Sequence, residues 1–263
     1  MTNSMATNAS VTDHPLPQQM QQHTYSIMYQ VEGSHWWFAG RRRIIASFLK
    51  RICADLRDKP RILDVGCGTG ANLELLDEFG QAEGVDVSPD ALAFCRQRGL
   101  ERVHLGEAEK LPYPDRSFDL VTALDVVEHL DDDVAGLKEM HRVLRRGGRA
   151  LLFVPAFKFL WGVQDDVSNH RRRYTRKQLK ETLRAAGFEI ERVTYANITF
   201  FFPILMGRLL MRLTGFRPAS ENNLTVGVLN KPLGIILGSE AGLLRCVNFP
   251  FGVSAICVAR RSE

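Results

Sequence analysis

The sequence predicts a doubly wound α/β fold, with a seven-stranded sheet, a helical segment before it and a helical insert before the last strand. An apolar run at 61–65 leads directly into glycines at positions 66, 68 and 70, and a helix-like segment follows over 71–79. A second strand-like run, 81–87, contains an acid near its end, Asp86. Strands that alternate with helices in this way favour a parallel sheet whose ligand site lies at the carboxyl ends of the strands.

The chain before the sheet divides into two expected parts. Residues 1–22 are rich in Asn, Thr, Ser and Gln and hold few large apolar side chains, so we expect a disordered tail. This stretch lacks the pattern of a secretory signal, and we expect a cytoplasmic protein, with contact at the inner face of the membrane left open. Residues 23–58 are expected to form a lid segment, in which the aromatic run 35–38 precedes a helix over 41–56 with a regular apolar stripe.

The glycine turn and the two acids around it predict a cofactor site. Alternating glycines let the backbone turn tightly and leave no Cβ between the main chain and a ligand. Asp64 can orient this loop or accept a hydrogen bond from a cationic group. The spacing from Asp64 to Asp86 is typical of folds in which an acid after the second strand binds ribose hydroxyls. An ordinary strand-to-helix turn with a solvated aspartate is the alternative interpretation.

The spacing of the glycines distinguishes between classes of nucleoside cofactor. The fingerprint of NAD-binding proteins is G-x-G-x-x-G, whose third glycine would come one position later than Gly70. No G-K-[ST] follows, which excludes a phosphate-binding Walker loop. An NAD or flavin oxidoreductase, and a non-catalytic protein that keeps the cofactor fold, remain as the two rival classes.

Four stretches resemble the motifs of one enzyme family, in the order that the family has them. Residues 63–70, Leu-Asp-Val-Gly-Cys-Gly-Thr-Gly, resemble the first motif of class I S-adenosylmethionine-dependent methyltransferases. Residues 84–92, 106–121 and 144–152 resemble the later motifs. Shorter patterns at 35–42, 170–174 and 248–254 resemble a bacterial type-11-like subgroup, many of whose members are thought to act on glycans, lipids or other secondary metabolites.

The resemblance implies a Rossmann-like methyltransferase fold, with its core over 59–199 and 248–263 and S-adenosyl-L-methionine as cofactor. It implies an in-line SN2 transfer of the methyl group to a small or a lipid- or glycan-like acceptor. Asp86 would bind the ribose hydroxyls, and Glu107, where the family usually has aspartate, would flank the adenine with Ala108. Trp37 and Arg41 would close on the methionine carboxylate, with plain core packing as the alternative. The expected cofactor-binding residues are Asp64, Gly66, Cys67, Gly68, Gly70, Asp86, Val87, Glu107, Ala108, Asp125, Trp37 and Arg41.

The loop after the fifth expected strand, 149–154, supplies the candidates for catalysis and acceptor binding, because in the family this loop lies over the transferable methyl group. His170 could act as a general base, since an unperturbed imidazole titrates near pH ~6.5. Arginines in this loop would suit a phosphate or carboxylate on the acceptor. The expected substrate contacts are Arg172, Arg173, Tyr174 and, one turn beyond Asp125, His129. A salt-bridged loop that only closes the site is the alternative.

Residues 200–247 lie between the sixth expected strand, 188–196, and the last, 251–260, and are far longer than a hairpin loop. Two apolar stretches, at 200–213 and 233–244, fall short of the ~20 apolar residues that cross a bilayer. Arg208 and Arg212 share one helical face of the first stretch. The sequence leaves three roles open for the insert: contact with a membrane or lipid-like acceptor, a cap over the substrate pocket, and a homodimer surface.

The charge and the cysteine content of the chain indicate which kinds of partner and site to expect. The net charge of +4 is modest but gathered in arginine clusters at 41–43, 145–146 and 171–173, which suits an anionic small molecule or a membrane surface better than long nucleic acid. The five cysteines show no paired spacing and no His/Cys cluster, so the sequence predicts neither disulfides nor a metal site.

Overall fold

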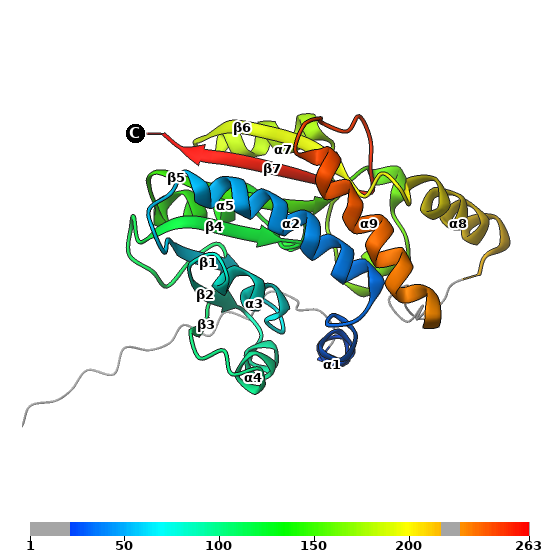
Figure 1. The fold of residues 1–263 in the computed structure, drawn as a ribbon, viewed down its shortest axis with the longest axis horizontal. Helices are drawn as coiled ribbons and strands as arrows, with labels where there is room; N and C mark the ends of the chain where they lie inside the picture. Colours follow the sequence, from blue (N-terminus) through cyan, green and yellow to red (C-terminus); the bar gives the residue numbers. More distant parts are fainter. Residues whose placement is uncertain (1–21, 217–226, 263) are drawn as a thin grey trace, which may run out of the picture.

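The computed structural model describes residues 22–216 and 227–262 (Figure 1). The expected disordered tail lies outside the described residues except for Gln22, which begins helix α1.

A seven-stranded sheet forms the centre of the described chain, in the order β3-β2-β1-β4-β5-β7-β6. The order reverses between β1 and β4, and the first five strands run parallel, whereas β7 is antiparallel to both of its neighbours. This confirms the predicted fold class. The strands are β1 Arg61–Val65, β2 Gln81–Asp86, β3 Val103–Leu105, β4 Phe118–Leu124, β5 Leu144–Pro155, β6 Phe188–Ala196 and β7 Ser254–Arg261.

Helices cover both faces of this sheet (Figure 1). Figure 1 shows α2 and α9 side by side across one face, with α5 and α7 on the opposite face. Local capping explains several of the boundaries: Ser88, Asp132 and Thr175 each accept a hydrogen bond from the first turn of the helix that follows. These helices are α3 Ala71–Asp77, α4 Pro89–Gln97, α5 Asp133–Val143, α6 Val163–Val167 and α7 Arg176–Ala185, with single turns η1 Val127–His129, η2 Lys158–Leu160 and η3 Gly227–Leu229.

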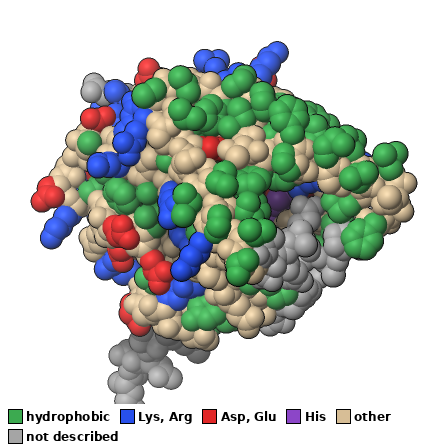
Figure 2. Space-filling model, turned by 45° about the vertical axis from the view of Figure 1, so that its right-hand side comes forward, with side chains coloured by type: hydrophobic (Ala, Val, Ile, Leu, Met, Phe, Trp, Pro, Cys, Tyr) green, Lys and Arg blue, Asp and Glu red, His purple; other side chains and the backbone are tan. Residues whose placement is uncertain are grey.

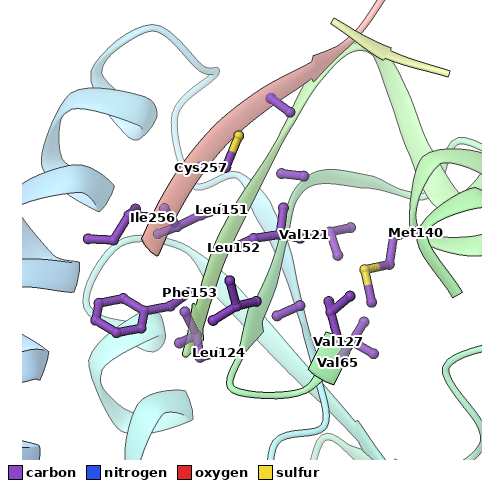
Figure 3. Packing of buried hydrophobic residues seen from close by; sticks show 14 of the residues in the cluster. Val65, Val121, Leu124, Val127, Met140, Leu151, Leu152, Phe153, Ile256 and Cys257 are labelled. Atoms are coloured by element: carbon purple, nitrogen blue, oxygen red, sulfur yellow. The ribbon is translucent and has the colours of Figure 1, made fainter. Parts of the chain in front are cut away.

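The core lies on both sides of the central strands β4, β5 and β7. Figure 3 shows Phe153 and Ile256 on the side of the sheet that faces α2, and Met140 of α5 on the other side near Val121. All of these side chains are almost completely buried. The packing fixes the carboxyl ends of β1, β4 and β5 relative to one another, and these ends carry the site.

The N-terminal segment forms two helices, α1 Gln22–Val31 and α2 Trp36–Ala54. Helix α2 begins at Trp36 rather than at position 41, so the aromatic run belongs to the helix instead of preceding it. The cause is a cap, because the His35 side chain accepts a hydrogen bond from the main-chain N–H of Trp37. The expected apolar stripe of α2 is buried against the sheet.

The insert forms α8 Phe201–Thr214 and α9 Asn230–Leu244, and α9 packs along α2. The two helices approach closely at Gly40, where a Cβ would lie 2.7 Å from the side chain of Leu237. Asn230 also accepts a hydrogen bond from the main-chain N–H of Trp36, at 2.8 Å. Buried Glu240 accepts hydrogen bonds from the main chain of Asn197 and Thr199, where β6 ends. Helix α9 therefore joins the N-terminal segment to the end of β6. Among the described helices, none is long and apolar enough to cross a membrane.

Candidate active site

A cavity of about 720 Å³ lies at the carboxyl ends of β1, β2 and β4, where α1, α2 and α8 cover it. The wall on the sheet side contains the glycine turn and the residues that follow β2. The wall on the insert side is formed mostly by apolar residues in and next to α8, together with Arg208. Lining residues on the sheet side include Gly66, Cys67, Gly68, Asp86, Val87 and Ala108, and those from the insert are Phe200, Pro203, Ile204, Gly207, Arg208, Met211 and Phe216.

The glycine turn presents its main chain to this cavity. Gly68 has a φ of +55°, and a Cβ built on it would have no neighbouring heavy atom within 4 Å. Any side chain at position 68 would therefore project into the space where a ligand can bind. Gly66, with a φ of +67°, leaves no room for a Cβ, which would lie 2.4 Å from Val126. Gly70 is the N-cap of α3 and is not among the residues that line the cavity.

Asp86 connects the end of β2 to the glycine turn. Its carboxylate accepts hydrogen bonds from the main-chain N–H groups of Gly68, at 2.8 Å, and Ser88, at 2.9 Å. Burial raises the pKa of Asp86, although these same hydrogen bonds oppose the change. Each carboxylate oxygen can accept a second hydrogen bond, so the group is able to bind a pair of neighbouring hydroxyls at the cavity wall. The site thus fits the ribose of a nucleoside cofactor.

Three other residues predicted for the cofactor differ in their distance from the cavity. Ala108 and Glu109 line the cavity. Glu107 does not line it, and its main chain forms an isolated antiparallel β-bridge with Lys110. Asp64 is buried beneath the turn, and Thr122 Oγ1 donates a hydrogen bond to it at 2.5 Å. Burial raises the pKa of Asp64 to about 7, with the Thr122 hydrogen bond opposing the shift. Asp64 therefore lies below the glycine turn, at the end of β1, rather than on the cavity surface.

Residues of α2 and the residue after β4 meet at the cavity. Arg41 of α2 pairs with Asp125 at 2.5 Å, and its guanidinium lies 4.2 Å from the ring centroid of Phe153. Trp37 lines the same cavity. Asp125 has a φ of +60°, which is unusual for a residue other than glycine, and its backbone is held by a hydrogen bond to Phe153. Strain of this kind is often found at functional sites.

Asp165, which the sequence gave no reason to single out, is the centre of a buried polar network beside the cavity. Its carboxylate accepts hydrogen bonds from Arg173 at 2.7 and 2.9 Å, from His170 Nδ1 at 2.8 Å and from the Gly162 N–H at 2.7 Å. Although burial opposes it, the hydrogen bonds from His170 and Arg173 hold the pKa of Asp165 below its ordinary value. Because an ionised carboxylate can only accept, the proton of the neutral His170 ring lies on Nδ1 and Nε2 is left as the acceptor.

The structure brings only some of the predicted acceptor contacts to the cavity. His129, His170 and Arg173 line it, and burial together with neighbouring His170 lowers the pKa of His129 to about 3. Arg172 instead donates to the carbonyl of Leu130 and pairs with Asp133, and the buried Tyr174 hydroxyl donates to Asp133. Neither Arg172 nor Tyr174 is among the lining residues.

Helix α1 supplies lining residues that the sequence analysis did not include. Tyr25 and Met28 of α1, and Glu32 just after it, border the cavity. Glu32 is buried, accepts hydrogen bonds from Arg98 and from the Thr69 hydroxyl, and so connects α1 to the glycine turn. The only sign of this contact in the sequence was the presence of one acid, Glu32, at the end of the amphipathic stretch 22–32.

Comparison with known proteins agrees with this geometry. A family model for a type-11 methyltransferase domain matches residues 63–152. The chain is 38% identical over 117 residues to the demethylmenaquinone methyltransferase of Chlorobaculum parvum, which covers 43% of this chain and 48% of the relative. It is 32% identical over 184 residues to the ubiquinone/menaquinone biosynthesis C-methyltransferase of Stenotrophomonas maltophilia. The aligned region covers 56% of this chain and 72% of the relative. The chain spans about half the length of several of the curated relatives it matches.

Solved structures share the fold. An S-adenosylmethionine-dependent methyltransferase from Thermotoga maritima, described as a possible histamine N-methyltransferase, superposes with a TM-score of 0.57 at 20% identity, covering 90% of this chain and all of that one. This likeness shows the fold. The Stenotrophomonas relative, 72% of which is covered at 32% identity, shows the family, in agreement with the match of the domain model to the strands that carry the glycine turn and Asp86. The chain belongs to the class I S-adenosylmethionine-dependent methyltransferases of the type-11 kind.

Proposed function

We propose that this protein transfers the methyl group of S-adenosylmethionine to a small, largely apolar acceptor that binds beneath α8. The supporting observation is that one cavity reaches from the glycine turn and Asp86 to an apolar wall made by α8. A donor and an acceptor bound at these two ends would share a water-poor space. Holding two reactants in line can supply much of the acceleration of a displacement reaction.

The residues that would hold the cofactor follow from the site. Asp86 binds the ribose hydroxyls, the main chain at Gly66 and Gly68 lies along the methionine portion, and the Arg41–Asp125 pair receives the charged amino-acid end. When bound, the cofactor supplies a methyl group on a sulfonium centre that is open to in-line attack. We assign proton acceptance from the acceptor to Nε2 of His170, because Asp165 fixes the ring through Nδ1 and His170 lines the cavity.

The character of the acceptor is inferred from the insert wall and from the relatives. Pro203, Ile204 and Met211 carry no charge, and the charged member of this wall, Arg208, lies 3.8 Å from the carboxylate of Asp165. This wall favours an apolar ring or chain. Among the relatives are proteins named for demethylmenaquinone and for ubiquinone/menaquinone biosynthesis. We therefore propose an acceptor of the quinone or a similar lipid-like type.

Filling the acceptor end of the cavity is expected to abolish methyl transfer without loss of cofactor affinity. Gly207 lines the cavity on α8, and a Cβ built there meets no atom within 4 Å. The Gly207→Trp variant should lower the transfer of labelled methyl groups to quinols or to a lipid extract by about 100-fold, since a misplaced acceptor loses the benefit of alignment. The matched control is Gly242→Trp, at an exposed position of α9 that is equally open.

Titration with S-adenosylhomocysteine completes this test. Both tryptophan variants should bind S-adenosylhomocysteine as tightly as the unaltered protein. Full transfer activity in Gly207→Trp would contradict the assignment of the acceptor end. No labelled product from any quinol or lipid fraction would contradict the proposed acceptor class.

The outer face of the insert suggests how a lipid-like acceptor reaches the cavity. Figure 2 shows hydrophobic side chains gathered on this part of the surface, beside a hollow in which a histidine is visible. The described part of the insert has no exposed acidic side chain, since its one acid, Glu240, is buried. Basic side chains at Arg212, Lys231 and Arg245 are exposed. The exposed apolar residues are Phe202, Met206, Leu209, Leu210, Leu213, Phe216, Val228, Leu229, Ile235, Ile236, Leu243 and Val247.

We propose that this apolar and basic face rests on an anionic lipid surface. Leu213 is 83% exposed, and Leu213→Glu should weaken binding to vesicles of phosphatidylglycerol and phosphatidylcholine about tenfold or more, because burying a leucine contributes ~1.5–3 kcal/mol. Leu105→Glu, at an exposed position of β3, is the control and should bind as the unaltered protein does. Co-sedimentation measures both. Equal binding of the two variants, or a dimer that Leu213→Glu dissociates, would refute the membrane contact.

A further inference from the structure

Three potential metal ligands that are far apart in the sequence meet beside the cavity. They are Glu128 and His129 of the turn η1 after β4, and His170 of the loop after β5. One ligand atom from each lies within 4.8 Å of the other two, and His170 Nε2 is 3.9 Å from Glu128 Oε1. Two of the three, His129 and His170, line the cavity. The rings of these two histidines lie 4.7 Å apart in a T-shaped arrangement.

The carboxyl group of Glu128 is the most unusual member of this cluster. Its side chain is completely buried, and within the described chain neither oxygen accepts a hydrogen bond from another residue. The nearby arginines are paired with other acids, Arg41 with Asp125 at 2.5 Å and Arg173 with Asp165 at 2.7 Å. These arginines act on Glu128 only at a distance, through their charge. A buried carboxylate that accepts no hydrogen bond is unfavourable in its charged form, and a directly bound cation would compensate that charge.

His170 is oriented in the manner of a metal ligand. His170 uses Nδ1 to donate to the carboxylate of Asp165, which Arg173 and the Gly162 N–H hold in place. His129 presents one ligand atom within 4.8 Å of those of Glu128 and His170. Histidines that bind metals almost always donate their second ring N–H to a carboxylate or a main-chain carbonyl, which fixes the tautomer and the direction of the ligating nitrogen.

We propose that Glu128, His129 and His170 bind a divalent first-row transition ion, with an open coordination position toward the acceptor end of the cavity. Two imidazoles and one carboxylate suit Zn²⁺, Co²⁺ or Fe²⁺, whereas Mg²⁺ and Ca²⁺ prefer oxygen ligands. Ligands of a tetrahedral ion at ~2.1 Å lie about 3.4 Å from one another, so binding requires the three side chains to close by roughly 0.5–1.4 Å. Side-chain rotation can supply movements of this size.

Such an ion would specify the acceptor more closely. If the proposed methyl transfer is right, an acceptor hydroxyl or enol at the open position loses its proton to solvent more readily, because the ion lowers its pKa. The anion then forms a bond to the methyl carbon as the bond from sulfur to that carbon breaks, and the oxidation state of the ion does not change. When the ion is bound, His170 Nε2 is a metal ligand and no longer accepts the proton of the acceptor. The ion then promotes loss of that proton in place of His170.

The test is direct titration of tag-free, chelator-treated protein with Zn²⁺ by calorimetry and with Co²⁺ by visible absorption. The unaltered protein is expected to bind one equivalent of each ion. Glu128→Gln keeps the shape of the side chain and should weaken binding by about 100-fold or more, beyond the usual cost of altering only a neighbouring hydrogen bond. His170→Gln should act in the same way. His104→Gln, at an exposed histidine of β3, should leave the affinity unchanged.

Two outcomes would overturn the metal site. One is the failure of the unaltered protein to bind either ion stoichiometrically. The other is binding that Glu128→Gln and His170→Gln do not weaken, which would place the ion on a cysteine such as exposed Cys246. Binding of S-adenosylhomocysteine is measured on the same samples. A protein that binds S-adenosylhomocysteine but no metal refutes the metal site alone, and one that does not bind S-adenosylhomocysteine refutes the proposed function.

Discussion

Replacing Asp86 by alanine is expected to weaken the binding of S-adenosylhomocysteine by at least tenfold. The carboxylate accepts hydrogen bonds from Gly68 and Ser88 and is the group assigned to the ribose hydroxyls. A hydrogen bond to a charged group contributes ~1.5–3 kcal/mol, which corresponds to roughly 10- to 150-fold in affinity. The affinity can be measured by isothermal titration calorimetry.

Two comparisons separate a direct contact from a general loss of structure. Glu101→Ala, at an exposed acid just before β3, should leave the affinity unchanged. Asp86→Asn keeps one acceptor oxygen and should lose less affinity than Asp86→Ala. Thermal unfolding without ligand reports whether the glycine turn still folds. An affinity for S-adenosylhomocysteine that is unaffected in Asp86→Ala would remove Asp86 from the cofactor site.

Replacing Asp165 by alanine is expected to lower the free energy of unfolding by about 3–5 kcal/mol, because it removes the carboxylate that a buried arginine binds through two hydrogen bonds. The side chain of Arg173 is only 4% exposed, and both of its hydrogen bonds to a carboxylate go to Asp165. Urea denaturation measures the change. The matched control is Glu181→Ala, which removes an exposed carboxylate 3.9 Å from Lys177 and should change stability by less than about 0.5 kcal/mol.

The difference in stability between the unaltered protein and Asp165→Ala should depend on pH. Folding holds the pKa of Asp165 below its ordinary value, so the folded state binds this proton less readily than the unfolded state. The stabilisation by Asp165 is therefore complete above the unfolded pKa of about 4 and is lost as the pH falls below it. The difference between the unaltered protein and Asp165→Ala should shrink on acidification below about pH 4. A loss of under about 1 kcal/mol at neutral pH would contradict the role of Asp165 as the partner of Arg173.

The sheet could be predicted because its signals are local. The sixth strand was expected over 188–196 and is β6 Phe188–Ala196, and the helix before it begins at a local cap, Thr175. The predicted start of α2 was wrong because, besides the local cap by His35, the first turn depends on contacts distant in sequence. Trp36 donates its N–H to Asn230, and its ring lies 4.7 Å from that of Phe200. Nothing near position 36 indicates that two segments of the insert will meet it.

The cofactor end of the site was more predictable than the acceptor end for a similar reason. Gly66, Gly68 and Asp86 belong to short turns between a strand and a helix, whose geometry follows from neighbouring residues. The orientation of 172–174 depends on the phase of an extended segment, in which successive side chains point to opposite sides. Arg173 points inward to Asp165, and Arg172 and Tyr174 point to Asp133. The sequence does not reveal this phase, because the partners lie in other loops.

The contact of α9 with α2 bears on the order of events in each catalytic cycle. Both α2 and α8 cover the same cavity, and α9 connects the helix that borders the donor to the segment that borders the acceptor. A movement that frees the spent donor will therefore also disturb the acceptor end. In the proposed reaction we therefore expect release of the two products to be coupled, because α9 contacts α2 and the residues just before α8.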